Sequence, residues 1–139
     1  MKIEEKMSKD DAELYIDEMA EKLEIDLLDF NVREKTSDEK KSSAFLLQGV
    51  MAGLIYYDEE KKCLAQKLTK TIRSGDFERN ELYYKNKFKV RDARKLKEGG
   101  YDASVKMLSR VCDVPEAIIN EMHGTNLEIA MACLDFFLK

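Results

Sequence analysis

The C-terminal segment is the feature that most constrains the fold. From Asn126 to Leu138 nearly every residue is apolar, and only Glu128 and Asp135 carry charge. A helix that is apolar around its whole circumference must be covered on all sides. Thr125 and Glu128 have the three-residue spacing of a capping box, which predicts that the helix starts there. We therefore expect a structural C-terminal helix, either at the centre of the domain or at an interface.

The composition is that of a folded domain. The 139 residues suffice for one domain with a sizeable core, and they are too few for two domains of ordinary size. The net charge of -4 and the pI near 5.2 argue against general binding to nucleic acid or to an anionic membrane. No apolar run reaches the roughly 18 residues of a membrane span, and the first nine residues lack the apolar core of a signal peptide. We expect a cytoplasmic protein that does not bind membranes.

The residues with the most reactive side chains are scattered. The cysteines Cys63, Cys112 and Cys133 are odd in number and widely spaced, which favours core packing over a disulfide framework or a zinc site. His123 has no cysteine or serine nucleophile at motif spacing, and the acidic turn Asp58–Glu60 lacks the spacing of a calcium loop. We therefore predict that the chain is not an enzyme and binds no cofactor or metal.

The first half of the chain begins with helical patterns. Apolar residues three to four apart predict a helix over Asp10–Leu23, whose other face is acidic. A second helix is expected over Asp38–Ala52. Within and after it, Gly49 and Gly53 suggest close packing or a stop. The polar stretch Arg33–Ser37 between the two helices reads as a linker.

After Gly53 the pattern changes from helical to extended. Leu54–Tyr57 and Lys62–Leu68, joined by the turn Asp58–Lys61, predict a β-hairpin. Arg73–Asn80 is predicted to be a loop. The alternation over Glu81–Val90 predicts a third, half-buried strand with Tyr83 and Lys85 on the face opposite Leu82 and Tyr84.

The remainder of the chain reads as short helices. A basic helix over Arg91–Lys97 is ended by the pair Gly99–Gly100, and a helix over Asp102–Val111 follows. Asp113 and Glu116 have capping-box spacing and predict the start of a further short helix.

These patterns together predict an α+β fold that is mostly helical. N-terminal helices precede a small antiparallel sheet, made of a hairpin plus one strand, and a C-terminal helical cluster closes the chain. The linker divides the sequence into an acidic helical extension, residues 1–36, and a single α+β domain, residues 37–139.

A basic segment alternates with aromatic residues and superficially resembles a platform for single-stranded nucleic acid. The alternation argues against this, because Tyr84 and Phe88 face away from the lysines. The lysines are equally explained as residues that protect an edge strand from pairing. The patch comprises Lys85, Lys87, Lys89, Arg91 and Arg94.

The chain from Gly53 to Lys139 resembles the tail assembly chaperones of long-tailed bacteriophages, particularly the Mu-like type. The likeness rests on the hairpin GLIYYDEEKKCLAQKL, on ELYYKNKFKVRDARKL, in which a strand leads into a helix, and on SVKMLSRVCDVPEAIINEMHGTNLEIAMACLDFFL. The last run has the family's helix, Pro-Glu step and closing apolar helix ending in phenylalanines. Where the family often has an aspartate that caps the final helix, this chain has Thr125 and Asn126.

The resemblance implies a non-enzymatic protein that coats the aggregation-prone tape-measure protein before the tail tube assembles. The tape-measure protein would be the partner, the tail-tube protein would later displace the chaperone, and a homo-oligomer is a further expectation. Methionines repack against varied partners, which suits such a surface. The residues that we expect to bind the partner are Met107, Met122, Leu127, Met131, Leu134, Phe137 and Leu138.

A protein of another class fits the sequence as an alternative. A small adaptor or regulatory domain would dimerise through the C-terminal helix and bind nucleic acid or an acidic protein through the basic segment 85–97. Strong salt dependence of binding would favour this alternative.

Overall fold

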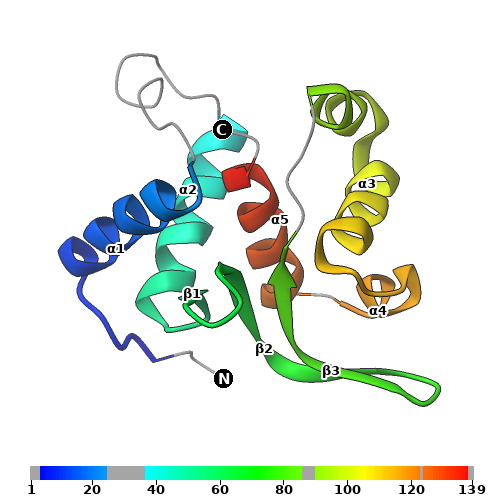
Figure 1. Cartoon of the computed structure of the whole chain (residues 1–139), viewed down its shortest axis with the longest axis horizontal. Coiled ribbons are helices and arrows are strands. Elements are labelled where there is room, and N and C mark those ends of the chain that lie inside the picture. The colour runs from blue at the N-terminus through cyan, green and yellow to red at the C-terminus, as the bar shows by residue number, and fades with distance from the viewer. Residues whose placement is uncertain (1–3, 25–36, 86–89, 123, 138–139) are drawn as a thin grey trace.

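The computed structural model describes residues 4–24, 37–85, 90–122 and 124–137. Two helices are followed by three strands and three further helices, so the predicted α+β class is confirmed. Figure 1 shows α5 between α1 and α2 on one side and α3 and α4 on the other. The elements are α1 (Lys9–Lys22), α2 (Ser37–Met51), β1 (Ile55–Asp58), β2 (Cys63–Ser74), β3 (Phe77–Tyr84), α3 (Val90–Cys112), α4 (Glu116–Asn120) and α5 (Thr125–Phe137).

The three strands form one antiparallel sheet in the order β1-β2-β3. The predicted hairpin is confirmed, because β1 pairs with β2 from Ile55 opposite Gln66 to Asp58 opposite Cys63. The predicted loop over Arg73–Asn80 is wrong, since β2 runs to Ser74 and β3 begins three residues later. Most of this hairpin tip is exposed on both faces, so no apolar alternation marks it as strand.

The third strand was expected in the right place but with different bounds. It covers residues 77–84 instead of 81–90, and positions 86–89 lie outside the described residues. The predicted alternation holds where it can be followed, because Leu82 and Tyr84 are 1% exposed whereas Lys85 is exposed.

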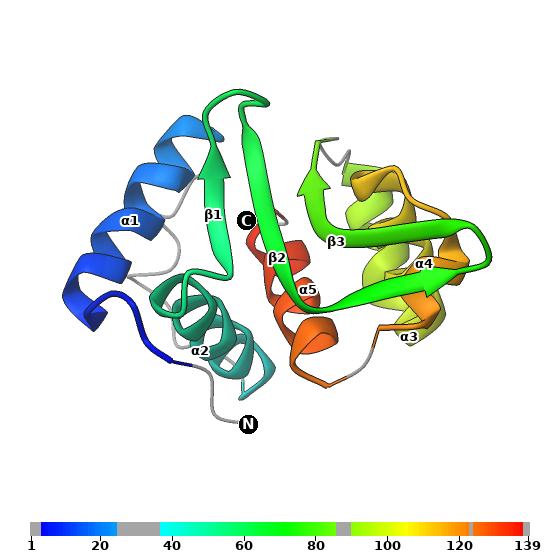
Figure 2. The ribbon, with the colours of Figure 1, turned by 90° about the horizontal axis from the view of Figure 1, so that it is seen from below.

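A large irregularity bends β2 in its middle. Lys67 pairs with Glu81, but the next pair is Ile72 with Arg79, so four residues of β2 face one residue of β3. A bulge leaves backbone groups without ladder partners and turns the strand. The bend carries the far end of β2 toward α4, as Figure 2 shows.

The apolar helix α5 lies at the centre of the core. This is one of the two positions that the sequence predicted, the other being an interface. It packs against α2 and against β2, and Ala130, Cys133 and Leu134 are fully buried. The helix includes Thr125 as its first residue, and the N–H of Glu128 donates to the carbonyl of Gly124 at 3.2 Å. Gly124 therefore precedes the first turn of α5. Thr125 is a residue of that turn and not its cap, which corrects the predicted capping box.

The helix α1 belongs to the same core. Ser8 caps it by accepting a hydrogen bond from the N–H of Asp11 at 3.2 Å, and Ala12 and Met19 are almost completely buried. The hydroxyl of Tyr15 accepts a hydrogen bond from the N–H of Tyr57 in β1 at 2.9 Å. The predicted linker over Arg33–Ser37 lies, except for its last residue, outside the described residues.

The C-terminal helices differ from expectation at their ends. Gly100 interrupts α3 with non-helical angles, φ 65° and ψ -145°, so the predicted break is confirmed. The predicted capping box of Asp113 and Glu116 is wrong, because Pro115 occupies the N-cap of α4 and no side chain caps that helix. Asp113 instead has a φ of 53°, where the chain turns between α3 and α4. None of the helices built from the described residues has the length and apolarity needed to span a bilayer.

Candidate functional site

The residues that were predicted to bind a partner divide into two groups. Met107, Met122 and Leu134 are 6%, 3% and 0% exposed, so they belong to the core of the single chain. Leu127 and Met131 are partly buried and pack against that core. The side chain of Phe137, and Leu138 as a whole, lie outside the described residues. The prediction of a partner surface therefore concerns Leu127 and Met131 among the residues whose side chains are described.

These two residues share one stripe of α5. Leu127, Glu128, Met131 and Asp135 are partly exposed, whereas the other described side chains between Asn126 and Phe136 are buried. Leu127, Met131 and Asp135 are spaced by four residues and therefore fall on the same face of the helix, with Glu128 at the edge of that face. The stripe is thus a narrow apolar strip flanked by two carboxylates.

The basic segment is described only in part. Lys85 is exposed at the end of β3, and Lys87 and Lys89 lie outside the described residues. Arg91 and Arg94 lie in the first half of α3, where only the backbone is described. The structure therefore leaves the predicted patch as a prediction.

One face of the sheet carries a cluster that sequence reasoning did not assemble. Gln66 points toward α5, because its side-chain amide donates to the carbonyl of Asn126 at 2.9 Å. Since strand side chains alternate between faces, Ala65 points the other way, together with its register partners Tyr56 and Tyr83. Figure 2 looks onto this side, where β2 lies in front of α5 and β1 lies beside it.

We call this cluster the open sheet face. Ala65 is 0% exposed although it points away from the core, because larger neighbours on the same face cover it. Lysine side chains lie beside the tyrosine rings on this face. The open sheet face comprises Tyr56, Lys61, Lys67, Glu81, Tyr83 and Lys85.

Glu81 organises the tyrosines. Its Oε2 atom accepts a hydrogen bond from the hydroxyl of Tyr83 and another, at 3.4 Å, from the hydroxyl of Tyr56. The hydrogen bond to the carboxylate favours the neutral phenol, so the pKa of Tyr83 lies above its usual value. Both hydroxyls are thereby tied to one carboxylate, which orients the two rings.

The lysines of the open sheet face contact rings and not carboxylates. The ammonium of Lys61 lies 4.2 Å from the ring centroid of Tyr83, that of Lys67 lies 5.5 Å from Tyr56, and that of Lys85 lies 5.8 Å from Tyr83. Such cation–π contacts hold a cation without neutralising its charge. Within the described part of the chain, none of these three lysines forms an ion pair. The face therefore presents positive charge to solvent.

The sequence signal for this face was incomplete. Alternation placed Tyr83 and Lys85 on the outer side of the third strand, but it could not place Tyr56 or Lys67 beside them. That juxtaposition depends on the register between three strands, which no local pattern encodes.

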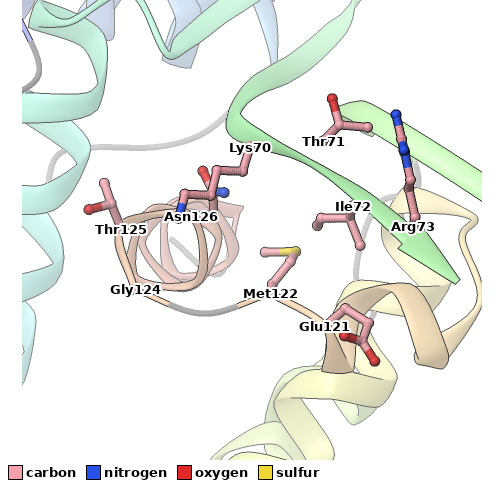
Figure 3. Close-up of a pocket in the computed structure, with 9 residues that line it drawn as sticks. All are labelled: Lys70, Thr71, Ile72, Arg73, Glu121, Met122, Gly124, Thr125 and Asn126. Atoms are coloured by element: carbon pink, nitrogen blue, oxygen red, sulfur yellow. The ribbon is translucent and has the colours of Figure 1, made fainter. Parts of the chain in front are cut away.

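A second feature is a pocket of about 360 Å³ where the bend in β2 meets the start of α5 (Figure 3). Ile72 and Met122 give it an apolar wall, and Arg73 and Glu121 lie toward one end. Arg73 pairs with Glu78 at 3.4 Å. In the described residues every buried polar side chain has a hydrogen-bond partner, so none is left directed into the pocket for a ligand.

The three cysteines are free thiols and are buried, which confirms the core-packing interpretation. Burial raises the pKa of Cys133 to about 12 and also raises the pKa of Cys112. A thiol with a raised pKa carries little thiolate at neutral pH and is a poor nucleophile. Across the described residues, no three histidine, cysteine, aspartate or glutamate side chains are grouped to hold a metal ion.

Comparison with protein-family models, with curated proteins and with solved structures finds no match to this chain.

Proposed function

We propose that the chain is a phage or prophage tail assembly chaperone that binds the tape-measure protein without catalysing a reaction. The observation that carries the proposal is the partly exposed stripe of α5, where Leu127 and Met131 lie beside the carboxylates of Glu128 and Asp135. Adjacent apolar side chains on an otherwise core helix suit an amphipathic helix of a partner. The order of a hairpin, a strand, a helix and a closing apolar helix also agrees with the order on which the resemblance rests.

The proposal is tested first on the gene neighbourhood and then by co-expression. A very long, helix-rich reading frame directly downstream is expected to encode the tape-measure protein. Co-expression with the chain should raise the soluble fraction of that protein. Leu127→Lys with Met131→Lys should abolish the effect, because two charges would then lie in the apolar contact.

The control distinguishes loss of binding from loss of fold. Glu116→Lys changes an exposed residue at the start of α4 and should solubilise the partner as well as the unchanged chain does. Circular dichroism must show that the double variant keeps its helices. Equal solubility of the tape-measure protein with and without the chain would contradict the proposal. Leu134→Ser is not a suitable probe, because that side chain is fully buried.

The adaptor alternative has one observation in its favour, which is the exposed Lys85 beside the ring of Tyr83. Binding to nucleic acid or to an acidic protein through residues 85–97 should weaken steeply as salt is added. Lys85→Glu should weaken it further. Binding that is insensitive to salt would exclude this alternative.

A further inference from the structure

The outer face of α1 carries charge opposite to that of the open sheet face. Spacings of three, four and seven residues place its carboxylates on one side of the helix, opposite the buried Ala12 and Met19. None of these carboxylates forms an ion pair with another described residue. We call this surface the acidic helix face, and it comprises Asp10, Glu13, Leu14, Asp17, Glu18 and Glu21.

An apolar residue lies in the middle of the acidic helix face. Leu14 is 62% exposed, and it is the one large hydrophobic side chain among the described residues with such exposure. Asp10 lies one turn before it, and Asp17 and Glu18 lie one turn after it. Single exposed leucines are common, but one ringed by carboxylates that pair with no described residue resembles the centre of a docking surface with a charged rim.

We propose that the chain self-associates head to tail, with the acidic helix face of one copy docked on the open sheet face of the next. The five carboxylates would face Lys61, Lys67 and Lys85, none of which forms an ion pair with another described residue. Leu14 would contact the rings of Tyr56 and Tyr83. This inference does not depend on the tape-measure proposal.

The arrangement of the two faces requires a second copy. Figure 2 shows α1 beyond the outer edge of β1, with the open sheet face turned toward the viewer. The hydrogen bond from Tyr57 to Tyr15 and the ion pair of Lys22 with Glu59, at 2.7 Å, hold α1 in that place. A chain therefore cannot place its own α1 across its own sheet. Two different surfaces that meet between copies form a heterologous contact, which closes into a ring or extends as a filament.

A second copy fits the open sheet face better than single-stranded nucleic acid does. The ammonium groups of Lys61 and Lys67 lie over the Tyr83 and Tyr56 rings, so a base would have to displace them in order to stack on those ring faces, whereas Leu14 needs only a ring edge. The chain has a net charge of -4, which disfavours binding to nucleic acid. An acidic helix with one central leucine supplies both the charge and the apolar contact.

Charge reversal tests the proposal on the full chain. Sedimentation equilibrium of the unchanged chain should give a mass that rises with concentration above the 16.1 kDa of the monomer. The rise should shrink as NaCl is raised from about 0.05 to about 0.5 M, because the screening length falls. A sheet variant, Lys67→Glu with Lys85→Glu, and a helix variant, Glu13→Lys with Asp17→Lys, should each weaken self-association by at least about tenfold, since like charges would then meet.

Mixing the sheet variant with the helix variant is the decisive experiment. The reversed helix face of one variant then meets the reversed sheet face of the other, and the two unchanged faces also meet. Association should therefore return in the mixture to a level well above that of either variant alone. As a matched control, Lys70→Glu with Lys106→Glu changes the net charge equally at exposed lysines outside both faces and should leave the mass unchanged.

Three results would overturn the proposal. The unchanged chain could remain monomeric at every concentration, the control could lose association as much as the sheet variant does, or the mixture could stay monomeric. Binding of an oligothymidylate probe by a monomeric chain, lost in the sheet variant, would assign the open sheet face to nucleic acid instead.

Discussion

Asn126 is a buried polar residue at the start of the most apolar helix, and its contacts account for its position. Its Oδ1 atom accepts hydrogen bonds from the N–H of Thr69 at 2.8 Å and from the Thr69 hydroxyl at 3.1 Å. Thr69 lies in the bend of β2, where no ladder partner is available. The backbone carbonyl of Asn126 accepts a hydrogen bond from the side-chain amide of Gln66. The side-chain carbonyl of Gln66 in turn accepts one from the hydroxyl of Tyr84 at 2.7 Å. One chain of hydrogen bonds thus joins α5 to the bent strand.

Replacing Asn126 by alanine should destabilise the fold. The N–H of Thr69 would lose its protein partner, and because Thr69 is exposed, water can replace that partner, so the loss is that of an ordinary hydrogen bond, about 0.5–1.5 kcal/mol. We expect the free energy of unfolding in urea, followed by circular dichroism, to fall by that amount. Asn120→Ala changes an exposed asparagine at the end of α4 and should have little effect. Equal effects of the two substitutions would show that the hydrogen bond to the bend contributes nothing.

This role of Asn126 was not accessible from the sequence. The capping prediction considered Thr125 and Glu128, which lie close together along the chain, and the structure corrected it. The partner of Asn126 is Thr69, 57 residues away along the chain. The N–H of Thr69 lacks a partner in the sheet only because the register between β2 and β3 shifts. A local pattern cannot encode a register shift between distant strands.

At the scale of elements, Gly49 allows α2 to lie directly against β1. A Cβ atom at this position would lie 2.5 Å from Cδ1 of Ile55 and 2.9 Å from its Cγ1. Ile55 is 1% exposed, so it has little room to move away. The close packing that the sequence suggested at this glycine is therefore confirmed.

The substitution Gly49→Ala should lower stability although alanine favours helix. The gain in helix propensity is about 1 kcal/mol, whereas overpacking of a core costs about 1–3 kcal/mol. We expect a net loss of about 1 kcal/mol, measured by urea unfolding. In the background Ile55→Val, which lacks Cδ1 but keeps Cγ1 at 2.9 Å, the same change should cost less. An identical loss in both backgrounds would mean that the contact with Ile55 is not the cause.

The elements themselves were largely predictable, and their ends were not. Apolar periodicity located α1, α2 and the hairpin, because each buries one face against the core, and continuous apolarity located α5, which is buried on most of its surface. The strands at the exposed tip between Arg73 and Asn80 were not predicted, since a strand that buries neither face has no apolar alternation. The start of α4 also escaped, because the chain turns at Asp113 with a positive φ instead of capping the helix with that side chain.

At the scale of the whole molecule, only the packing of the chain shows which of the predicted site residues are buried and which are exposed. A stripe of Met and Leu residues at helical spacing reads the same whether it faces a core or a partner. The structure buries Met107, Met122 and Leu134 and leaves Leu127 and Met131 partly exposed. The open sheet face needed the register of three strands. The sequence could therefore identify candidate residues, but it could not distinguish those of the core from those of the surface.

The place of α1 leads to a prediction about cooperativity. The sequence was divided into an extension, residues 1–36, and a domain, residues 37–139. In the structure Met19 and Leu23 are 1% and 8% exposed within the same core as α2 and α5, and the N–H groups of Lys6 and Met7 both donate to the carbonyl of Met51. The contacts of α1 therefore resemble those of a core element.

We expect a fragment of residues 37–139 to be less stable than the full chain by at least about 3 kcal/mol, since two large apolar side chains at about 1.5–3 kcal/mol each lose their burial. Against a total stability of about 5–15 kcal/mol, this loss should abolish or strongly weaken the cooperative urea transition. In the full chain Met19→Ala should lower the whole transition, whereas Leu14→Ala, at an exposed position of the same helix, should not. A fragment that unfolds at the same urea concentration as the full chain would instead establish residues 1–36 as a separate extension.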